Sequence, residues 1–261
     1  MSESRSLLRP SRRLRQDVPR PVRAAEVRVQ LCLLGAFELV SDRVPVRLPL
    51  SAQRVVAFVA LHERPLPRAH VAGSLWLDSP DDRAGANLRS ALWRIHRVEP
   101  RLIEVSDRQL QLSDEVQVDL REAEAVARRE LHADVGDGAG IEISALTGDL
   151  LPDWYEDWVL FERERFRQMR LRALDALCER LTRAGRLNEA MEAALLSVAG
   201  DPLRESAQRA LVQVHLCEGN AGEAVRAYRL YQRLLQEQLG IQPSERMQEL
   251  VAALDNQETE R

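Results

Sequence analysis

The sequence predicts an α+β domain over residues 27–115, followed by an all-α domain over residues 116–255. Three observations support this division. The first half mixes short alternating apolar runs with helical runs, whereas the second half has only the helical period. A motif in the second half recurs at the interval of helical-hairpin repeats. The charge also divides, because residues 1–115 carry 19 Arg and 14 acidic residues, whereas residues 116–261 carry 18 Arg and 27 acidic residues.

The charge distribution indicates different partners for the two halves. A basic first half favours nucleic acid, and an acidic second half favours protein. Residues 1–26 contain seven Arg and predict a disordered basic tail; residues 256–261 predict a short C-terminal tail. No apolar run is long enough for a membrane span or an export signal, and the three Cys are widely spaced. These features predict a cytoplasmic protein with reduced thiols and no membrane partner.

The first domain begins with strands and continues with helices. Strands at 27–34, 36–40 and 44–48 predict a small antiparallel sheet. Helices are expected from a Ser51 cap to Leu61, over 68–77 and over 81–97, and apolar runs at 102–105 and 109–112 predict a hairpin around 106–108. Sheet, three helices and hairpin is the order of a winged helix-turn-helix domain, in which the third helix reads the major groove.

The third helix carries two stripes at about 100° per residue. Leu88, Ala91, Leu92 and Ile95 repeat at the spacing of a buried face. The second stripe consists of Asn87, Ser90, Arg94 and Arg97, whose side chains suit base edges and phosphates. An ordinary amphipathic surface helix would show the same pattern, so this helix alone does not distinguish the two interpretations. The strands, helices and hairpin around it favour the DNA interpretation.

The second half predicts stacked helices. Asp119 and Glu122 have the spacing of a capping box for a helix to about Leu131, and a glycine-rich loop is expected over 132–140. Gly185, Glu189 and Ala190 recur as Gly219, Glu223 and Ala224, each 34 residues later, which is the tetratricopeptide period. Further helices are expected near 157–183, 187–199, 203–218, 220–238 and 244–255.

An aromatic cluster lies at the start of the first of these helices. It consists of Trp154, Tyr155, Trp158 and Phe161. We expect these side chains to form core between the two halves; the alternative is a ligand cage.

The N-terminal sheet before the helices resembles the OmpR/PhoB-type DNA-binding domain of response regulators, without a receiver domain. The whole of residues 28–255 resembles the SARP-type antibiotic regulators, which join such a winged helix to a bacterial transcriptional activator domain. The matching strings are Val118 to Ala123, Gly148 to Pro152, Trp158-Val159, Glu162 to Arg165, Asp201 to Glu205, Ala224 to Tyr231 and Leu239 to Ser244.

This resemblance implies a transcriptional activator of a secondary-metabolite gene cluster. It further implies a homodimer that binds direct repeats in double-stranded DNA and contacts RNA polymerase at the nucleoid. The chain has no Lys, so it contains no ATPase P-loop, and it is similar to the short, stand-alone members of the family. It departs from the response-regulator pattern in carrying Trp93 and His96 where basic residues are frequent.

Seven residues are predicted to contact DNA. Arg94 is the expected base contact, and Arg89 and Arg97 are expected at phosphates. Trp93 packs either on the sugar backbone or on the domain itself, and Arg108 meets the backbone or minor groove. Together with Asn87 and Ser90 these residues form the predicted interface.

Asp78, Asp81 and Asp82 have two interpretations, either as helix caps or as an acidic contact for polymerase. No catalytic, cofactor or metal motif occurs in the sequence, and His215 and Cys217 are poorly spaced for a metal pair on a helix. We therefore predict a non-enzymatic protein. Its function is either sequence-specific transcriptional activation or that of a tetratricopeptide-type scaffold whose winged helix binds protein.

Overall fold

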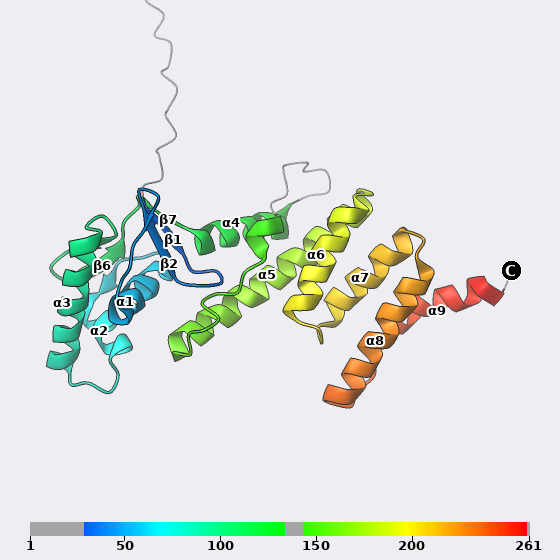
Figure 1. Cartoon of the computed structure of the whole chain (residues 1–261). Helices are drawn as coiled ribbons and strands as arrows, with labels where there is room; N and C mark the ends of the chain where they lie inside the picture. Colours follow the sequence, from blue (N-terminus) through cyan, green and yellow to red (C-terminus); the bar gives the residue numbers. More distant parts are fainter. Residues whose placement is uncertain (1–28, 134–142, 260–261) are drawn as a thin grey trace, which may run out of the picture.

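The computed structural model describes residues 29–133 and 143–259, with side chains described as far as residue 252 (Figure 1). The mixed N-terminal part lies at one end of the molecule, and the helices of the second half extend away from it in an array. The predicted tail at 1–26 and most of the predicted loop at 132–140 lie outside the described residues.

The N-terminal part is the predicted winged helix-turn-helix. Its elements are β1 (Val29–Cys32), β2 (Glu38–Ser41), β3 (Val44–Pro45), α1 (Leu50–Ala60), β4 (Leu66–Pro67), α2 (Arg68–Leu75), α3 (Asp81–Val98), β5 (Ile103–Val105), β6 (Gln109–Leu112) and β7 (Val116–Val118). The strands form two sheets of order β3-β2-β1-β7 and β4-β6-β5. The three helices share one apolar core with both sheets.

The structure corrects the predicted sheet and its boundary. β7 pairs in parallel with β1, with Val29 opposite Val116 and Leu31 opposite Val118. A domain ending at residue 115 would therefore lose a strand of the first sheet, which is mixed rather than purely antiparallel. The predicted hairpin gains a third strand, because β4 pairs with β6. β4 is too short to give an alternating pattern in the sequence.

The predicted side-chain caps are wrong. α1 begins at Leu50 after Pro49, α3 at Asp81 after Pro80, and none of α1, α3 and α4 (Asp119–His132) has a side-chain cap. Proline supplies the extended residue that precedes α1 and α3. Asp81 and Asp82 still lie in the first turn of α3, where their charges favour the helix dipole.

The second half is helical, as predicted. After α4 come η1 (Ile143–Leu146), a short turn that the sequence did not indicate, and then α5 (Asp157–Arg183), α6 (Leu187–Gly200), α7 (Glu205–Cys217), α8 (Ala221–Leu239) and α9 (Glu245–Thr259). The last helix continues beyond residue 255, so the predicted tail at 256–261 begins too early.

The 34-residue repeat corresponds to two equivalent helix ends. Gly185 follows α5 with φ +73°, and Gly219 follows α7 with φ +77°. In each case the next residue closes the turn, since Arg186 N–H donates to Leu181 O at 3.0 Å and Asn220 N–H donates to His215 O at 2.9 Å. This left-handed glycine cap allows the following helix to return antiparallel to the first.

Ala190 and Ala224 mark the close helix contacts of the repeat. Both are fully buried, the first in α6 and the second in α8. Ala190→Trp or Ala224→Trp is expected to overpack these contacts and lower the free energy of unfolding by about 1–3 kcal/mol. Ala199→Trp, at an exposed position of α6, is the matched control and should unfold at the wild-type urea concentration. Wild-type stability in both buried variants would contradict the stacking.

A junction of residues 148–154 joins the two halves. Leu151 N–H donates to Leu33 O at 2.9 Å, and Gly35 N–H donates to Asp149 O at 2.8 Å. From the other side, Arg163 Nη2 donates to Trp154 O at 2.7 Å, and Arg170 Nη2 donates to an Asp149 carboxylate oxygen at 2.6 Å. The end of β1 and two arginines of α5 therefore hold this segment between the two halves.

Only two of the four clustered aromatic side chains form core between the two halves. Trp154 and Trp158 pack against the N-terminal core, and Trp158 meets Phe58 of α1 edge to face with ring centroids 5.2 Å apart. Tyr155 and Phe161, by contrast, are 78% and 71% exposed. The prediction fails for these two, which do not pack against the apolar core that Trp154 and Trp158 contact.

Candidate nucleic-acid interface

α3 forms the outer edge of the N-terminal part, at the end of the molecule opposite α9 (Figure 1). Its predicted core stripe is confirmed, since Leu88, Ala91, Leu92 and Ile95 are buried, together with Ala84. The remaining faces of α3 are free to meet a partner. The structure therefore presents a clamped helix with a solvent-facing polar side.

The residues predicted to read bases lie together on that side. Arg94 and Ser90 are exposed, and Asn87 is half-buried at the edge of the core stripe. Ser90 Oγ donates to Ala86 O at 3.0 Å, within the helix. The hydroxyl proton is therefore already bound, and Ser90 is left to act as an acceptor. Arg94 is the long, charged donor at the centre of this face.

Arg97, on the predicted polar stripe, forms a pair with Trp93 beside that stripe. Trp93 is 61% exposed, and the guanidinium carbon of Arg97 lies 5.4 Å from the centroid of its ring. A cation over an aromatic face is attracted by the ring quadrupole. Trp93 thus holds the Arg97 side chain against the helix surface. The side chain of Arg89 runs back along the helix, so that its Nη1 lies next to Gly85. A side chain at position 85 would occupy the space that the Arg89 guanidinium uses.

Arg108 lies at the tip of the β5–β6 hairpin, as predicted. The loop of residues 106–108 is closed by Ser106, whose N–H donates to Gln109 O at 3.0 Å and whose hydroxyl accepts from Gln109 N–H at 3.0 Å. Arg68 N–H donates to Arg108 O at 2.9 Å. The wing tip is therefore tied to the first residue of α2.

Two further arginines belong with these residues. Arg83 is exposed in the first turn of α3, one turn before Asn87 and on the same face. Arg68 stands beside the wing tip at the start of α2. The spacing of Arg83 was visible in the sequence, whereas the position of Arg68 depends on the pairing of β4 with β6.

The acidic residues predicted to contact polymerase precede and open α3. Asp78, Asp81 and Asp82 are exposed, and within the described residues none of them has an ion pair. Leu77, next to Asp78, is 80% exposed. The loop and the first turn of α3 thus present an exposed apolar side chain close to exposed carboxylates.

Glu99 fixes the end of α3 to the first sheet. It is only 3% exposed, and its carboxylate accepts hydrogen bonds from Arg101 Nε at 2.9 Å and from the Ser41 hydroxyl. Arg101 also reaches Asp42 at 3.3 Å in the turn between β2 and β3. Hydrogen bonding from Arg101 lowers the pKa of Glu99 to about 2. The sequence did not indicate this network, because Ser41 and Glu99 are far apart in the chain.

A carboxylate with a lowered pKa stabilises the fold only while it is ionised. Glu99→Gln is therefore expected to reduce the free energy of unfolding at neutral pH by about 1.5–3 kcal/mol, the range for hydrogen bonds to charged groups. The deficit should shrink as the pH falls from the ordinary value near 4.5 toward about 2, because wild-type Glu99 then becomes protonated too. Urea unfolding over this pH range measures the deficit, and Glu104→Gln at an exposed position is the control. A deficit independent of pH would contradict the assignment.

Residues 114–254 match the bacterial transcriptional activator domain, over more than half of the chain. The chain belongs to the bacterial transcriptional activator domain family. The match confirms the resemblance to SARP-type regulators that the strings of the second half indicated. No curated protein sequence matches this family member.

A solved structure similar to this activator-domain protein is Mycobacterium tuberculosis EmbR in complex with low affinity phosphopeptide. The two share 20% sequence identity with a TM-score of 0.70, over 88% of this chain and 65% of that chain. The activator-domain protein thus spans slightly under two thirds of the EmbR chain, and the likeness confirms its fold. None of its described helices is long and apolar enough to cross a bilayer.

Proposed function

We propose that this transcriptional activator binds double-stranded DNA sequence-specifically through α3 and the wing. The observation that carries the proposal is the exposed face of α3, where Arg94 stands with Asn87 and Arg83 beside it. Arginine on a helix clamped at the molecular edge suits bidentate contact with guanine in the major groove. Arg89, Arg97 and Arg108 surround this face as candidate phosphate contacts.

The finer proposal is a homodimer on a direct repeat in the promoters of a secondary-metabolite, antibiotic gene cluster. It rests on the resemblance to SARP-type regulators. In this arrangement Asp78, Asp81 and Asp82 meet RNA polymerase, since they are exposed and have no ion pair among the described residues. DNA and polymerase would then contact different residues of the same helix-turn-helix, on the nucleoid in the cytoplasm.

Footprinting and in vitro transcription with the full chain test this function together. The templates are the promoters flanking its own gene. We expect two protected half-sites about one helical turn apart, with binding that weakens steeply as salt rises. Transcription should rise with occupancy, and replacing the three aspartates by asparagine should reduce transcription without altering the footprint. Absence of duplex binding at low salt would favour the alternative, a scaffold whose winged helix binds protein.

A further inference from the structure

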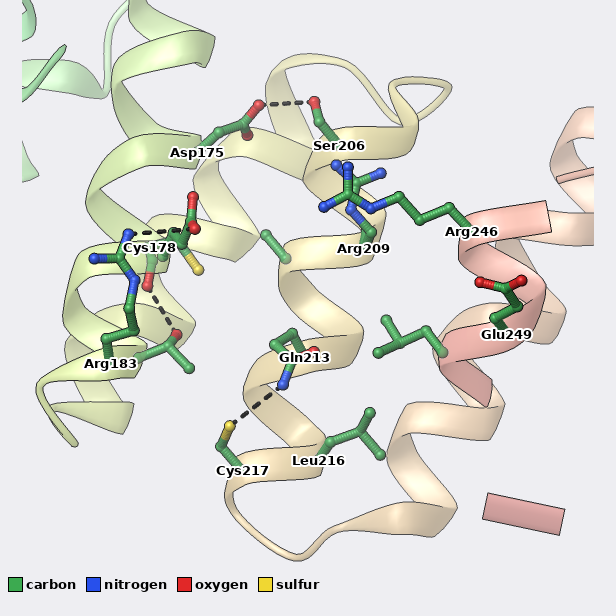
Figure 2. A pocket seen from close by; sticks show the side chains of 14 residues that line it. Asp175, Cys178, Arg183, Ser206, Arg209, Gln213, Leu216, Cys217, Arg246 and Glu249 are labelled. Atoms are coloured by element: carbon green, nitrogen blue, oxygen red, sulfur yellow. Dashed lines mark hydrogen bonds and ion pairs between the residues drawn. The ribbon is translucent and has the colours of Figure 1, made fainter. Parts of the chain in front are cut away.

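The helices of the second half enclose a groove at the end of the molecule away from α3. The groove has a volume of about 950 Å³, and its walls are α5, α7 and α9 (Figure 2). This is near the upper end of the range of about 300–1,000 Å³ found for ligand sites. None of the DNA-binding residues proposed above contributes to it.

Two carboxylates of this groove already have close partners, whereas two of its arginines do not. Asp175 is fully engaged, since it accepts hydrogen bonds from the hydroxyls of Ser197 and Ser206, each at 2.7 Å, and from Arg204 Nη2 at 2.9 Å. Glu179 pairs with Arg183 at 3.2 Å. These carboxylates are therefore not available to neutralise further cations.

Two arginines remain at one end of the groove. Arg209 of α7 lies 3.7 Å from its nearest carboxylate, Glu205, and Arg246 of α9 has no ion pair or hydrogen bond among the described residues. Figure 2 shows Arg246 reaching across the groove toward α7, so that both guanidinium groups lie near Ser206. Glu249, the remaining carboxylate, is well separated from both guanidinium groups in this view.

The position of Arg246 is built into the fold. Glu205, at the start of α7, accepts hydrogen bonds from the backbone N–H of Ser244 at 2.9 Å and from its hydroxyl. This contact holds the first turn of α9 against α7. Arg246 is thereby kept opposite Arg209, although two cations repel each other at close range. An anion between them would relieve that repulsion and accept charge-assisted hydrogen bonds.

We propose that this groove binds an acidic peptide segment of a partner protein, with a side-chain carboxylate held by Arg209 and Arg246. Apolar surface lines the same groove at Ala210, Leu216 and Leu250, which a peptide would cover and an inorganic anion would leave exposed. The DNA backbone is a poor occupant, because residues 116–261 carry 27 acidic residues and only 18 Arg. The site therefore serves a protein contact separate from DNA recognition.

Selection from a phage-displayed library of random peptides, on the full chain, tests this inference. A parallel selection uses the double variant Arg209→Gln, Arg246→Gln. Peptides recovered only on the wild type should be enriched in Asp and Glu relative to the unselected library. A fluorescent copy of the most enriched peptide should bind the double variant at least about tenfold more weakly, which corresponds to about 1.4 kcal/mol.

The matched control is Arg226→Gln, Arg229→Gln, which removes the same charge from two exposed positions of α8 outside the groove and should bind the peptide like the wild type. Saturating duplex DNA should leave peptide binding unchanged, so a failure of the DNA proposal is distinguished from a failure of this one. The inference is overturned by peptides without acidic enrichment, by recovery of no peptide that distinguishes the two proteins, or by displacement of the peptide by DNA.

Discussion

Arg94→Ala is expected to weaken binding of the full chain to its cognate duplex by about 1–3 kcal/mol and to relax specificity at one base pair. The reason is the placement of Arg94 on the exposed face of α3 beside Asn87, where its guanidinium can donate two hydrogen bonds to a guanine. Arg94 is exposed and does not belong to the buried core stripe, so the change should leave folding intact. Binding curves on cognate and scrambled duplexes over a salt series measure the effect.

Arg97→Ala provides the contrasting case. The Arg97 guanidinium lies over Trp93 near the end of the helix, where α3 would leave the groove and pass the backbone. We expect its loss to weaken binding to all sequences alike and to reduce the salt slope by about one. Equal losses on both duplexes for Arg94→Ala would instead make Arg94 a phosphate contact and rotate the proposed placement of α3.

Asp119→Ala is expected to lower the free energy of unfolding by about 2–4 kcal/mol. The carboxylate of Asp119 accepts hydrogen bonds from the backbone N–H of Leu33 at 2.8 Å, of Leu34 at 3.0 Å and of Leu120 at 2.7 Å. Each N–H left without an acceptor in a buried setting costs about 1–3 kcal/mol. Alanine would release the end of β1 from the start of α4, and so loosen the contact between the two halves.

Asp114→Ala is the matched control for that measurement. It removes the same charge five residues earlier, at an exposed position, and should change stability by less than about 0.5 kcal/mol. Urea unfolding of the full chains, followed by both circular dichroism and tryptophan fluorescence, compares the three proteins. A wild-type midpoint for Asp119→Ala would show that water replaces the carboxylate without loss.

Patterns that depend on near neighbours in the chain were predictable. The stripe of Leu88, Ala91 and Leu92 gave the buried face of α3, and the return of Gly185 as Gly219 gave the helical repeat, because helix periodicity and the left-handed glycine cap are local properties. The ends of α4 to α8 were accordingly predicted to within about two residues, whereas α9 continues four residues beyond its predicted end at 255.

Contacts between distant segments were not predictable in this way. The pairing of Val116–Val118 with β1 and the network of Glu99 with Ser41 join residues far apart in the sequence. Asp119 illustrates the difference, since its spacing from Glu122 indicated a capping box, yet its carboxylate is used mainly by Leu33 and Leu34. Which residues of α3 touch DNA likewise depends on a partner that the sequence does not contain, so Arg94 and its neighbours stay predictions.

The parallel pairing of β7 with β1 also bears on how this protein can be divided. A fragment ending at residue 115 would uncover the N–H and C=O groups of Val29–Cys32, a largely apolar strand that would become the rim of its sheet. Open rims of this kind recruit strands from other molecules and promote aggregation. Poor solubility of such a fragment would then reflect a severed sheet, and it would carry no information about whether α3 recognises DNA.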